Sequence, residues 1–134
     1  RLSTLIPFVA ARPGDTTAFA DQVRDGVSDA LWQGQGMLLD TYQMFAAALT
    51  AGPLPVGIGV GLMPLRHPVE AAIQARSLAA QTELGVVAGF GPGGADFQRA
   101  VLGAPYERPL AAAREYVDVV RTLLAEGAVE HDGA

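Results

Sequence analysis

The sequence contains no cysteine and no lysine, and only 17% of its 134 residues are charged. The absence of cysteine excludes disulfide bonds, zinc-thiolate sites and thiol catalysis. A formal net charge of −5 argues against nucleic-acid binding, because that affinity comes mainly from neutralising phosphates. No apolar run approaches the roughly 18 residues that span a membrane, and the N-terminus lacks a basic region followed by an apolar block. We therefore expect a soluble, cytoplasmic protein with no nucleic-acid or membrane partner.

Strand-like and helical segments alternate along the chain, half of which is hydrophobic. Four apolar runs, at residues 2–8, 29–32, 56–62 and 85–90, have centres about 27 residues apart, close to the length of one βαβ repeat. Between them the sequence predicts helices over residues 16–24, 40–52 and 69–82. The spacing therefore predicts an α/β protein with parallel strands.

Capping signals set the expected ends of these helices. Asp15 is a possible cap for the first, and Asp40 with Gln43 forms a capping-box pattern at the start of the second. A fourth helix is expected after Pro109 and before Gly127. One apolar stripe is expected on that helix, formed by Leu110, Ala113, Val117, Val120 and Leu124. Residues 89–106 show at most a turn of helix near 97–101, so we expect a long functional loop there.

Two architectures fit this alternation, a (β/α)8 barrel and an open doubly wound sheet. A complete barrel needs about 250 residues, so four units would be its first half, whereas an open sheet of four strands would be complete. In both, ligands bind at the carboxyl ends of the strands. Those ends fall at residues 8–11, 33–39, 62–67 and 89–94.

The third strand runs into a turn and then a helix in the segment PVGIGVGLMPLRHP. Its three glycines, Gly57, Gly59 and Gly61, fall on one face because side chains alternate along a strand. Something bulky could approach the backbone on that face. In the turn, His67 could act as an acid or base, or cap the following helix. Arg66 could bind an anion or pair with Glu70 one turn along.

Two polar or glycine-rich segments follow the other strands. GFGPGG, residues 89–94, could bind a phosphate, lie against a flat ring or form a plain turn. Its spacing departs from the dinucleotide motif, and no helix is expected to follow it at once. Gln33 and Gln35 could hydrogen-bond the edge of a ligand or be ordinary loop residues, but amides cannot transfer protons near neutral pH. Asp40 is expected to cap a helix, and no hydrolase or metal motif is present.

These segments, taken in order, resemble the bacterial-luciferase-like oxidoreductases that use flavin or deazaflavin. VGIGVGLMPLRHPVEAAIQARSLA is similar to the third strand and helix of that family, SDALWQGQ to its second strand and VVAGFGPGG to its fourth. PYERPLAAAREYVDVVRTLL resembles the following helix, and the final VEHDGA resembles the segment beyond it. The resemblance implies that residues 1–134 form a single domain or fragment, the N-terminal half of a (β/α)8 barrel.

The resemblance also implies a cofactor at the C-terminal mouth of the barrel, with coenzyme F420 favoured and FMN as the alternative. It places a cis peptide between Gly59 and Val60 in the third strand. Two departures from the family pattern leave the catalytic acid unassigned: Gln35 and Gly36 stand where many F420-dependent members have an acid and a histidine, and Gly94 stands where some have glutamate. No metal ligand is expected. The expected cofactor-binding residues are Phe8, Gln33, Gln35, Gly59, Val60, Gly61, Gly89, Phe90 and Gly91.

Three hypotheses about the whole protein follow. The first is an oxidoreductase that passes hydride between the cofactor and a small or peptide-linked unsaturated substrate. The second is a non-catalytic half-barrel that completes its sheet with a partner chain, since an isolated half would expose strand edges and apolar interior. The third is that these residues are part of a longer protein. A homodimer through helices that include residues 43–49 and 72–79 is also expected from the resemblance.

Overall fold

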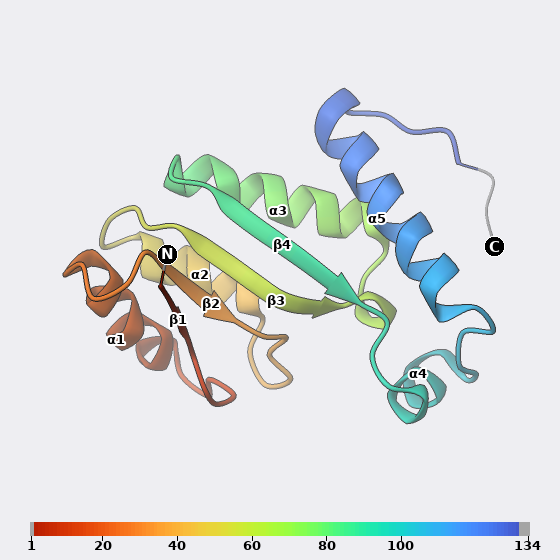
Figure 1. Ribbon diagram of the computed structural model, residues 1–134, viewed down its shortest axis with the longest axis horizontal. Helices are drawn as coiled ribbons and strands as arrows, with labels where there is room; N and C mark the ends of the chain where they lie inside the picture. The colour runs from red at the N-terminus through yellow and green to blue at the C-terminus, as the bar shows by residue number, and fades with distance from the viewer. Residues whose placement is uncertain (1, 132–134) are drawn as a thin grey trace. The chain divides into compact units, whose positions relative to one another are not determined.

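The computed structural model describes residues 2–131, and strands and helices alternate along them (Figure 1). The end of the VEHDGA segment, residues 132–134, lies outside this range. The elements are β1 (Ser3–Leu5), α1 (Pro13–Arg24), β2 (Ala30–Gln33), α2 (Thr41–Leu49), β3 (Val56–Leu62), the 3-10 turn η1 (Met63–Leu65), α3 (Pro68–Thr82), β4 (Val86–Gly91), α4 (Ala95–Leu102) and α5 (Pro109–Glu126). The four predicted strands are thus all present, and β3 has the predicted bounds.

The strands form one parallel sheet in the order β1-β2-β3-β4. Strand order therefore follows chain order, as it does when each helix returns the chain to the next position in a barrel. In this register Leu5 lies beside Trp32, and Trp32 lies beside Gly57. Neighbouring residues in a parallel register point to the same side of a sheet, so these three share one face.

Contacts divide the chain into two compact units. Unit 1 contains the described residues up to Gly61 together with Ser77–Gly89, and therefore most of the sheet. Unit 2 contains Leu62–Arg76 and the described residues from Phe90 onward.

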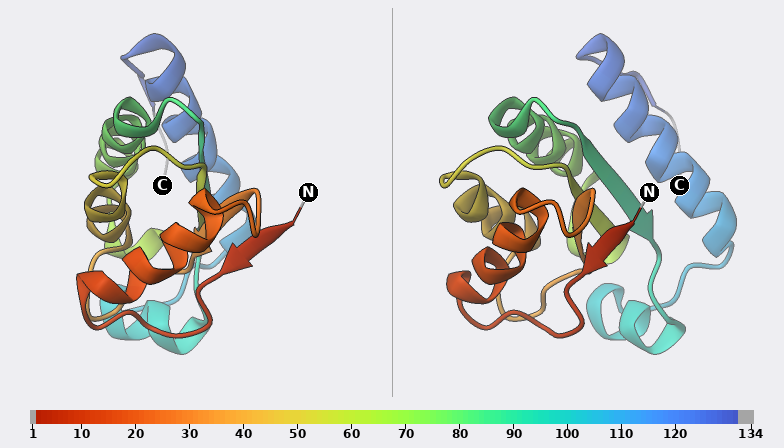
Figure 2. Two further views of the ribbon diagram at one scale, coloured as in Figure 1. Left: turned by 90° about the vertical axis from the view of Figure 1, so that its left-hand side faces the viewer. Right: turned by 60° about the vertical axis from the view of Figure 1, so that its left-hand side comes forward.

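The core of unit 1 lies where α1 and α2 cover one face of the sheet (Figure 2). Leu31 and Ile58 reach this core from β2 and β3, and Phe45 reaches it from α2; none of the three side chains is exposed. Side chains alternate between the two faces along β2 and β3, and Leu31 and Ile58 point toward the helices. The opposite face has Leu5 and Val87, which are 58% and 55% exposed.

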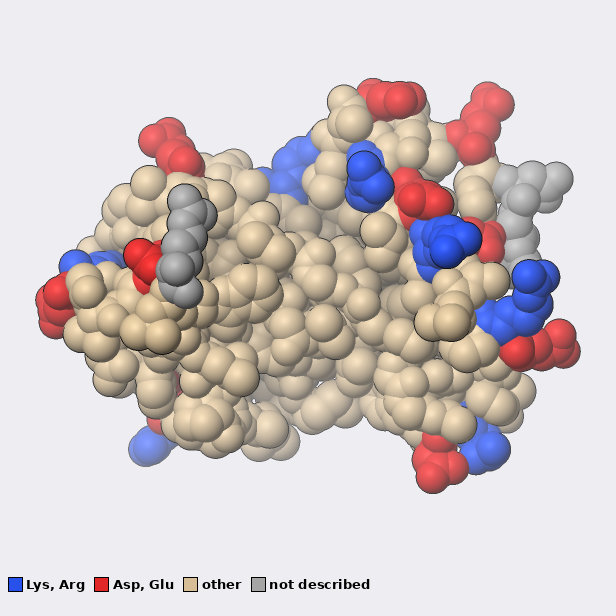
Figure 3. Space-filling model, viewed as in Figure 1, with Lys and Arg blue, Asp and Glu red and all other residues tan. Residues whose placement is uncertain are grey.

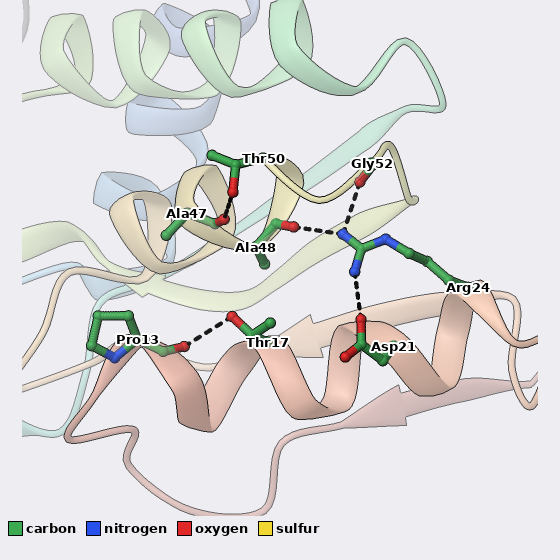
Figure 4. A network of polar contacts seen from close by, with 8 residues as sticks. All are labelled: Pro13, Thr17, Asp21, Arg24, Ala47, Ala48, Thr50 and Gly52. Carbon is green, nitrogen blue, oxygen red and sulfur yellow. Dashed lines mark hydrogen bonds and ion pairs between the residues drawn. The ribbon is translucent and has the colours of Figure 1, made fainter.

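Arg24 joins the two helices of unit 1 through polar contacts (Figure 4). Its Nη2 donates to the carbonyl oxygens of Ala48, at 2.5 Å, and Gly52, at 2.8 Å, and its Nη1 pairs with Asp21 at 2.9 Å. The last carbonyls of a helix have no partner within the helix. A cation at that position also complements the helix dipole. Arg24, the last residue of α1, therefore caps the C-terminal end of α2. No local sequence signal revealed this contact.

The first helix begins earlier than the sequence predicted. α1 starts at Pro13 and not at residue 16, with proline in its first turn. Asp15 is the third helical residue and not the cap; its Oδ2 accepts hydrogen bonds from the backbone N–H groups of Ala11 and Arg12. These hydrogen bonds lower the pKa of Asp15. In contrast, Asp40 caps α2 as predicted, accepting from the Gln43 backbone N–H at 3.1 Å.

Tyr42, on α2, gives unit 1 a measurable pH dependence. Burial raises its pKa from 10.0 to about 12, because the phenolate is disfavoured away from water. The Tyr42 hydroxyl therefore holds its proton more tightly in the folded chain than in the unfolded chain. Its contribution to the free energy of unfolding is fully present below pH 10 and is lost as pH rises through about 12. We expect a tyrosinate absorbance titration to show a late step that Tyr42→Phe removes. Titration of Tyr42 with ordinary tyrosines near pH 10 would contradict this.

Unit 2 has its own apolar core between α3 and α5. Met63, Ala71, Ala72, Tyr116 and Val120 form this cluster, against which Phe90 and Leu123 pack. Arg76 of α3 donates to the carbonyl oxygens of Leu123 and Leu124, at 2.6 and 3.1 Å.

The predicted stripe on α5 was wrong in part. Val120 is buried, but Leu110 is 86% exposed, and Tyr116 and Val119 are the other buried residues. Tyr116 was not part of the predicted stripe. That hydroxyl donates to the Arg66 carbonyl oxygen at 3.1 Å, so the ring can be buried without losing its hydrogen bond.

The region predicted as a loop contains a helix, α4, which begins immediately after Gly94. The prediction that no helix follows the glycine-rich run was therefore wrong. Gln98 holds this helix to its flanks: it is 4% exposed, donates to the Gly93 carbonyl oxygen at 2.7 Å and accepts from the Tyr106 N–H at 2.9 Å. These tertiary contacts stabilise a helix too short to show a clear pattern in the sequence.

Candidate functional site

A cavity of about 330 Å³ opens in unit 1 at the carboxyl ends of β1 and β2, beside Gly59 in the middle of β3. Parallel strands end at the same edge of a sheet, so loops that are distant in sequence meet there. The volume is within the range of small-molecule pockets. None of the residues around the cavity is charged: Leu5, Ile6, Pro7, Phe8, Val9, Gln33, Gly34, Gln35, Gly36 and Gly59.

Four of the expected cofactor-binding residues, Phe8, Gln33, Gln35 and Gly59, line this cavity. Phe8 is held at the rim by an edge contact with Phe19 of α1, with ring centroids 5.7 Å apart. The structure therefore brings together residues from the ends of β1 and β2 and from the middle of β3.

Gly89 of β4 packs against Val60 of β3 within unit 1. A Cβ atom on Gly89 would lie 2.9 Å from the Ile58 carbonyl oxygen and 3.2 Å from Cγ1 of Val60. Only glycine allows this close approach of β4 to β3. The peptide bond between Gly59 and Val60 is cis, which confirms the expectation drawn from the family resemblance.

Val60 and Gly89 do not line the cavity, and neither do the remaining three expected residues. Gly61 is buried at the end of unit 1. Phe90 and Gly91 belong to unit 2, where the ring of Phe90 packs against Tyr116 with centroids 5.3 Å apart. Phe90 is thus part of an apolar core in its unit.

The two glutamine side chains at the end of β2 are held by the protein. Gln33 is 3% exposed, and its Oε1 accepts a hydrogen bond from the Thr16 hydroxyl at 3.1 Å. The Nε2 of Gln35 donates to the Gly36 carbonyl oxygen at 2.8 Å. Thr41 joins the same loop to α2, donating to the Gly34 carbonyl oxygen at 2.7 Å and accepting from the Gly36 N–H at 2.9 Å. This rim of the cavity is consequently well fixed.

Trp32 occupies the face from which the β3 glycines remove side chains. A Cβ atom on Gly57 would lie 2.5 Å from Cε2 and Cε3 of Trp32, and one on Gly59 would lie 3.2 Å from Cε3. The bulky group expected against these glycines is therefore, in part, an indole from the neighbouring strand. Sequence reasoning missed this contact because it depends on the register between β2 and β3.

The structure gives structural roles to the polar residues in the β3–α3 turn. The Nδ1 of His67 accepts from the Val69 backbone N–H at 3.3 Å, so His67 caps α3, the structural alternative of the two considered. Arg66 contributes its carbonyl oxygen to the hydrogen bond from Tyr116. Within residues 2–131, no group of three or more His, Cys, Asp or Glu side chains is arranged to hold a metal ion. In the same range no helix has both the length and the apolar character to cross a membrane.

Comparisons with known proteins identify the fold. A family model described as luciferase-like monooxygenase matches residues 8–134. The crystal structure of the monooxygenase RslO1 from Streptomyces bottropensis matches with a TM-score of 0.83 and 19% sequence identity, covering 98% of this chain and 45% of that one. A comparison with the curated proteins gave no match.

A second solved structure is the oxygenating constituent of 3,6-diketocamphane monooxygenase from Pseudomonas putida, a type II Baeyer-Villiger enzyme in complex with FMN. It matches with a TM-score of 0.81 and 16% identity, covering 99% of this chain and 41% of that one. The chain thus spans less than half the length of either structure. Identities this low show a common fold alone, and that fold is the predicted one: (β/α) units that form part of a barrel.

Proposed function

This chain belongs to the luciferase-like monooxygenase family, and we propose that it forms the cofactor seat of a flavin-dependent oxidoreductase whose barrel is completed by further polypeptide. The observation that carries the proposal is the uncharged cavity at the carboxyl ends of β1 and β2, beside Gly59 of β3. Two features of known proteins support it: the description of the family as luciferase-like monooxygenase and the FMN in the Pseudomonas putida structure.

The residues around the cavity fit a flat, largely neutral ring. Gly34 and Gly59 face each other, since a Cβ atom on Gly34 would lie 3.5 Å from the Gly59 carbonyl oxygen. Both residues line the cavity, so backbone without side chains forms this part of its surface. Phe8 supplies an apolar wall that is 48% exposed, and Gln35 lies at the polar rim. We assign these residues, with Gln33, Val60 and Gly89, to the seat; Gly61, Phe90 and Gly91 stay predictions.

Bound FMN would supply the redox chemistry, since flavins carry electron and hydride transfer that side chains cannot perform. This chain would bind and orient the ring and exclude water from it. No titratable side chain lines the cavity, so proton transfer would have to involve groups outside this set. That division of labour agrees with Gln35 and Gly36 standing where many F420-dependent members have an acid and a histidine.

We favour FMN over coenzyme F420, the cofactor that the sequence resemblance put first. The missing acid and histidine remove the feature that points most directly to F420, and a matched structure of the same fold contains FMN. The substrate would be a small organic molecule that reaches the cavity from the mouth of the barrel.

Titration of the complete protein with each cofactor tests this proposal. We expect the visible absorbance of FMN to shift on binding, with a dissociation constant of about 10 µM or lower, and F420 to bind more weakly. Tighter binding of F420 would reverse the choice of cofactor. If neither binds in the micromolar range, the redox proposal fails.

The exposed apolar face of unit 1 supports a second part of the proposal, that other polypeptide covers it. Leu5 and Val87 are more than half exposed on strands, and the space-filling view shows few charged atoms over β2 and β3 (Figure 3). A sheet face of this kind is normally covered. The remainder of a longer chain, a partner chain or a second copy would cover it. The mass of the intact polypeptide, measured with the native mass of the assembly, distinguishes these three sources.

A further inference from the structure

Trp32 lies against Gly57 and Gly59 of β3, and Gly59 lines the proposed flavin seat. It is the only tryptophan in the sequence, it is half-buried, and it stands beside Gly57 in the register of β2 and β3. Its indole extends over β3 along the face that Gly57 and Gly59 leave open. Gly59 is also part of the cavity lining. The indole and the cavity are therefore separated at this point by a residue without a side chain.

The contact geometry shows which edge of the indole approaches the cavity. The position of a Cβ atom on Gly59 is 3.2 Å from Cε3 and 3.5 Å from Cζ3 of Trp32, so the six-membered ring is the nearer part. On Gly57 the same ring leaves no room for a Cβ atom at all. The ring thus leaves no room for a Cβ atom at Gly57 and would still be in tight contact with one at Gly59, 3.2 Å from Cε3.

We propose that Trp32 is a positioning residue that forms the floor under Gly59 and sets the depth at which the flavin ring binds; this rests on the proposed function. Trp32 acts through the Gly59 backbone. A smaller side chain would let this part of β3 relax and would deepen the cavity. The absence of side chains at Gly57 and Gly59 then has one physical reason: a Cβ atom at either position would meet the indole, so glycine lets the ring pack against the β3 backbone.

The test compares variants of the complete protein by their FMN dissociation constant, the visible spectrum of bound FMN and its midpoint potential. We expect Trp32→Ala to raise the dissociation constant about 10-fold and to change the spectrum, because Gly59 loses the ring that supports it and shifts against the flavin. Trp32→Phe should retain most of the affinity. Phe45→Ala is the control: it removes a buried aromatic ring from the opposite face of the sheet and should lower stability without changing the spectrum or potential of bound FMN.

A second variant keeps the inference testable if Trp32→Ala folds poorly. Gly57→Ala places a methyl group where the indole lies, so it should displace the ring and weaken FMN binding by a similar factor. Gly57→Ala combined with Trp32→Phe should weaken FMN binding less than Gly57→Ala alone, because the smaller ring can move. FMN binding and spectra that are unchanged in Trp32→Ala and Gly57→Ala would overturn the role of Trp32 and leave the flavin proposal intact. Absence of binding by the unaltered protein would overturn both.

Discussion

Replacing Gly59 with valine is expected to weaken FMN binding by about 100-fold, the largest change in affinity that a single substitution at this cavity should produce. A Cβ atom at this position would stand 3.2 Å from the Trp32 ring, so the branched valine side chain would press on that ring and displace Gly59, which lines the cavity. Overpacking of this kind costs about 1–3 kcal/mol, and the lost space for the ligand adds to it. Titration by flavin absorbance in the complete protein measures the effect.

Two further variants separate loss of the seat from general damage. Gly59→Ala should weaken binding less than Gly59→Val, because it adds a single methyl group. Gly14→Val, in α1, is the matched control, since nothing lies within 4 Å of a Cβ atom at Gly14. It should leave the dissociation constant unchanged. Equal affinity in Gly59→Val and the unaltered protein would show that the ring binds elsewhere.

The parts of the fold that depend on local signals could be predicted from the sequence. β3 is a continuous apolar run between prolines, and it has the predicted bounds. Asp40 and Gly127 mark helix ends through capping and a positive φ of 79°, and both act as predicted. The cis peptide after Gly59 followed from family resemblance and not from physical reasoning on the residues.

The features that depend on tertiary contacts could not be predicted in this way. α4 is held by Gln98, whose partners Gly93 and Tyr106 are known only once the chain is folded. The buried face of α5 includes Tyr116 because a carbonyl oxygen lies within reach of its hydroxyl.

The same distinction applies to the cavity. Its position at the ends of β1 and β2 could be predicted from parallel topology, and Phe8, Gln33, Gln35 and Gly59 line it, whereas their role in cofactor binding stays a prediction. The pairing of Trp32 with Gly57 depends on strand register, which alternation along single strands does not determine. The three β3 glycines therefore indicated an open face, but the sequence did not show that an indole occupies part of it.

Phe45→Ala is expected to lower the free energy of unfolding by about 3–5 kcal/mol, the largest loss of stability for a single core substitution in unit 1. Phe45 is fully buried on α2, against the helix-covered face of the sheet. Removing the ring loses the free energy gained by transferring it from water to the core. It also leaves a cavity, which the sheet cannot close because its hydrogen bonds hold the strands in place. Urea denaturation followed by circular dichroism measures the change.

Phe8→Ala is the matched control, because it removes the same ring from a position that is 48% exposed. We expect it to cost about 1 kcal/mol of stability, since water already covers half of the ring and only the edge contact with Phe19 is lost. If Phe8 is a wall of the flavin seat, this variant should weaken FMN binding, whereas Phe45→Ala should not. Similar stability losses in the two variants would contradict the assignment of the core to the helix-covered face. The two variants thus distinguish the contribution of Phe45 to the stability of unit 1 from the contribution of Phe8 to FMN binding.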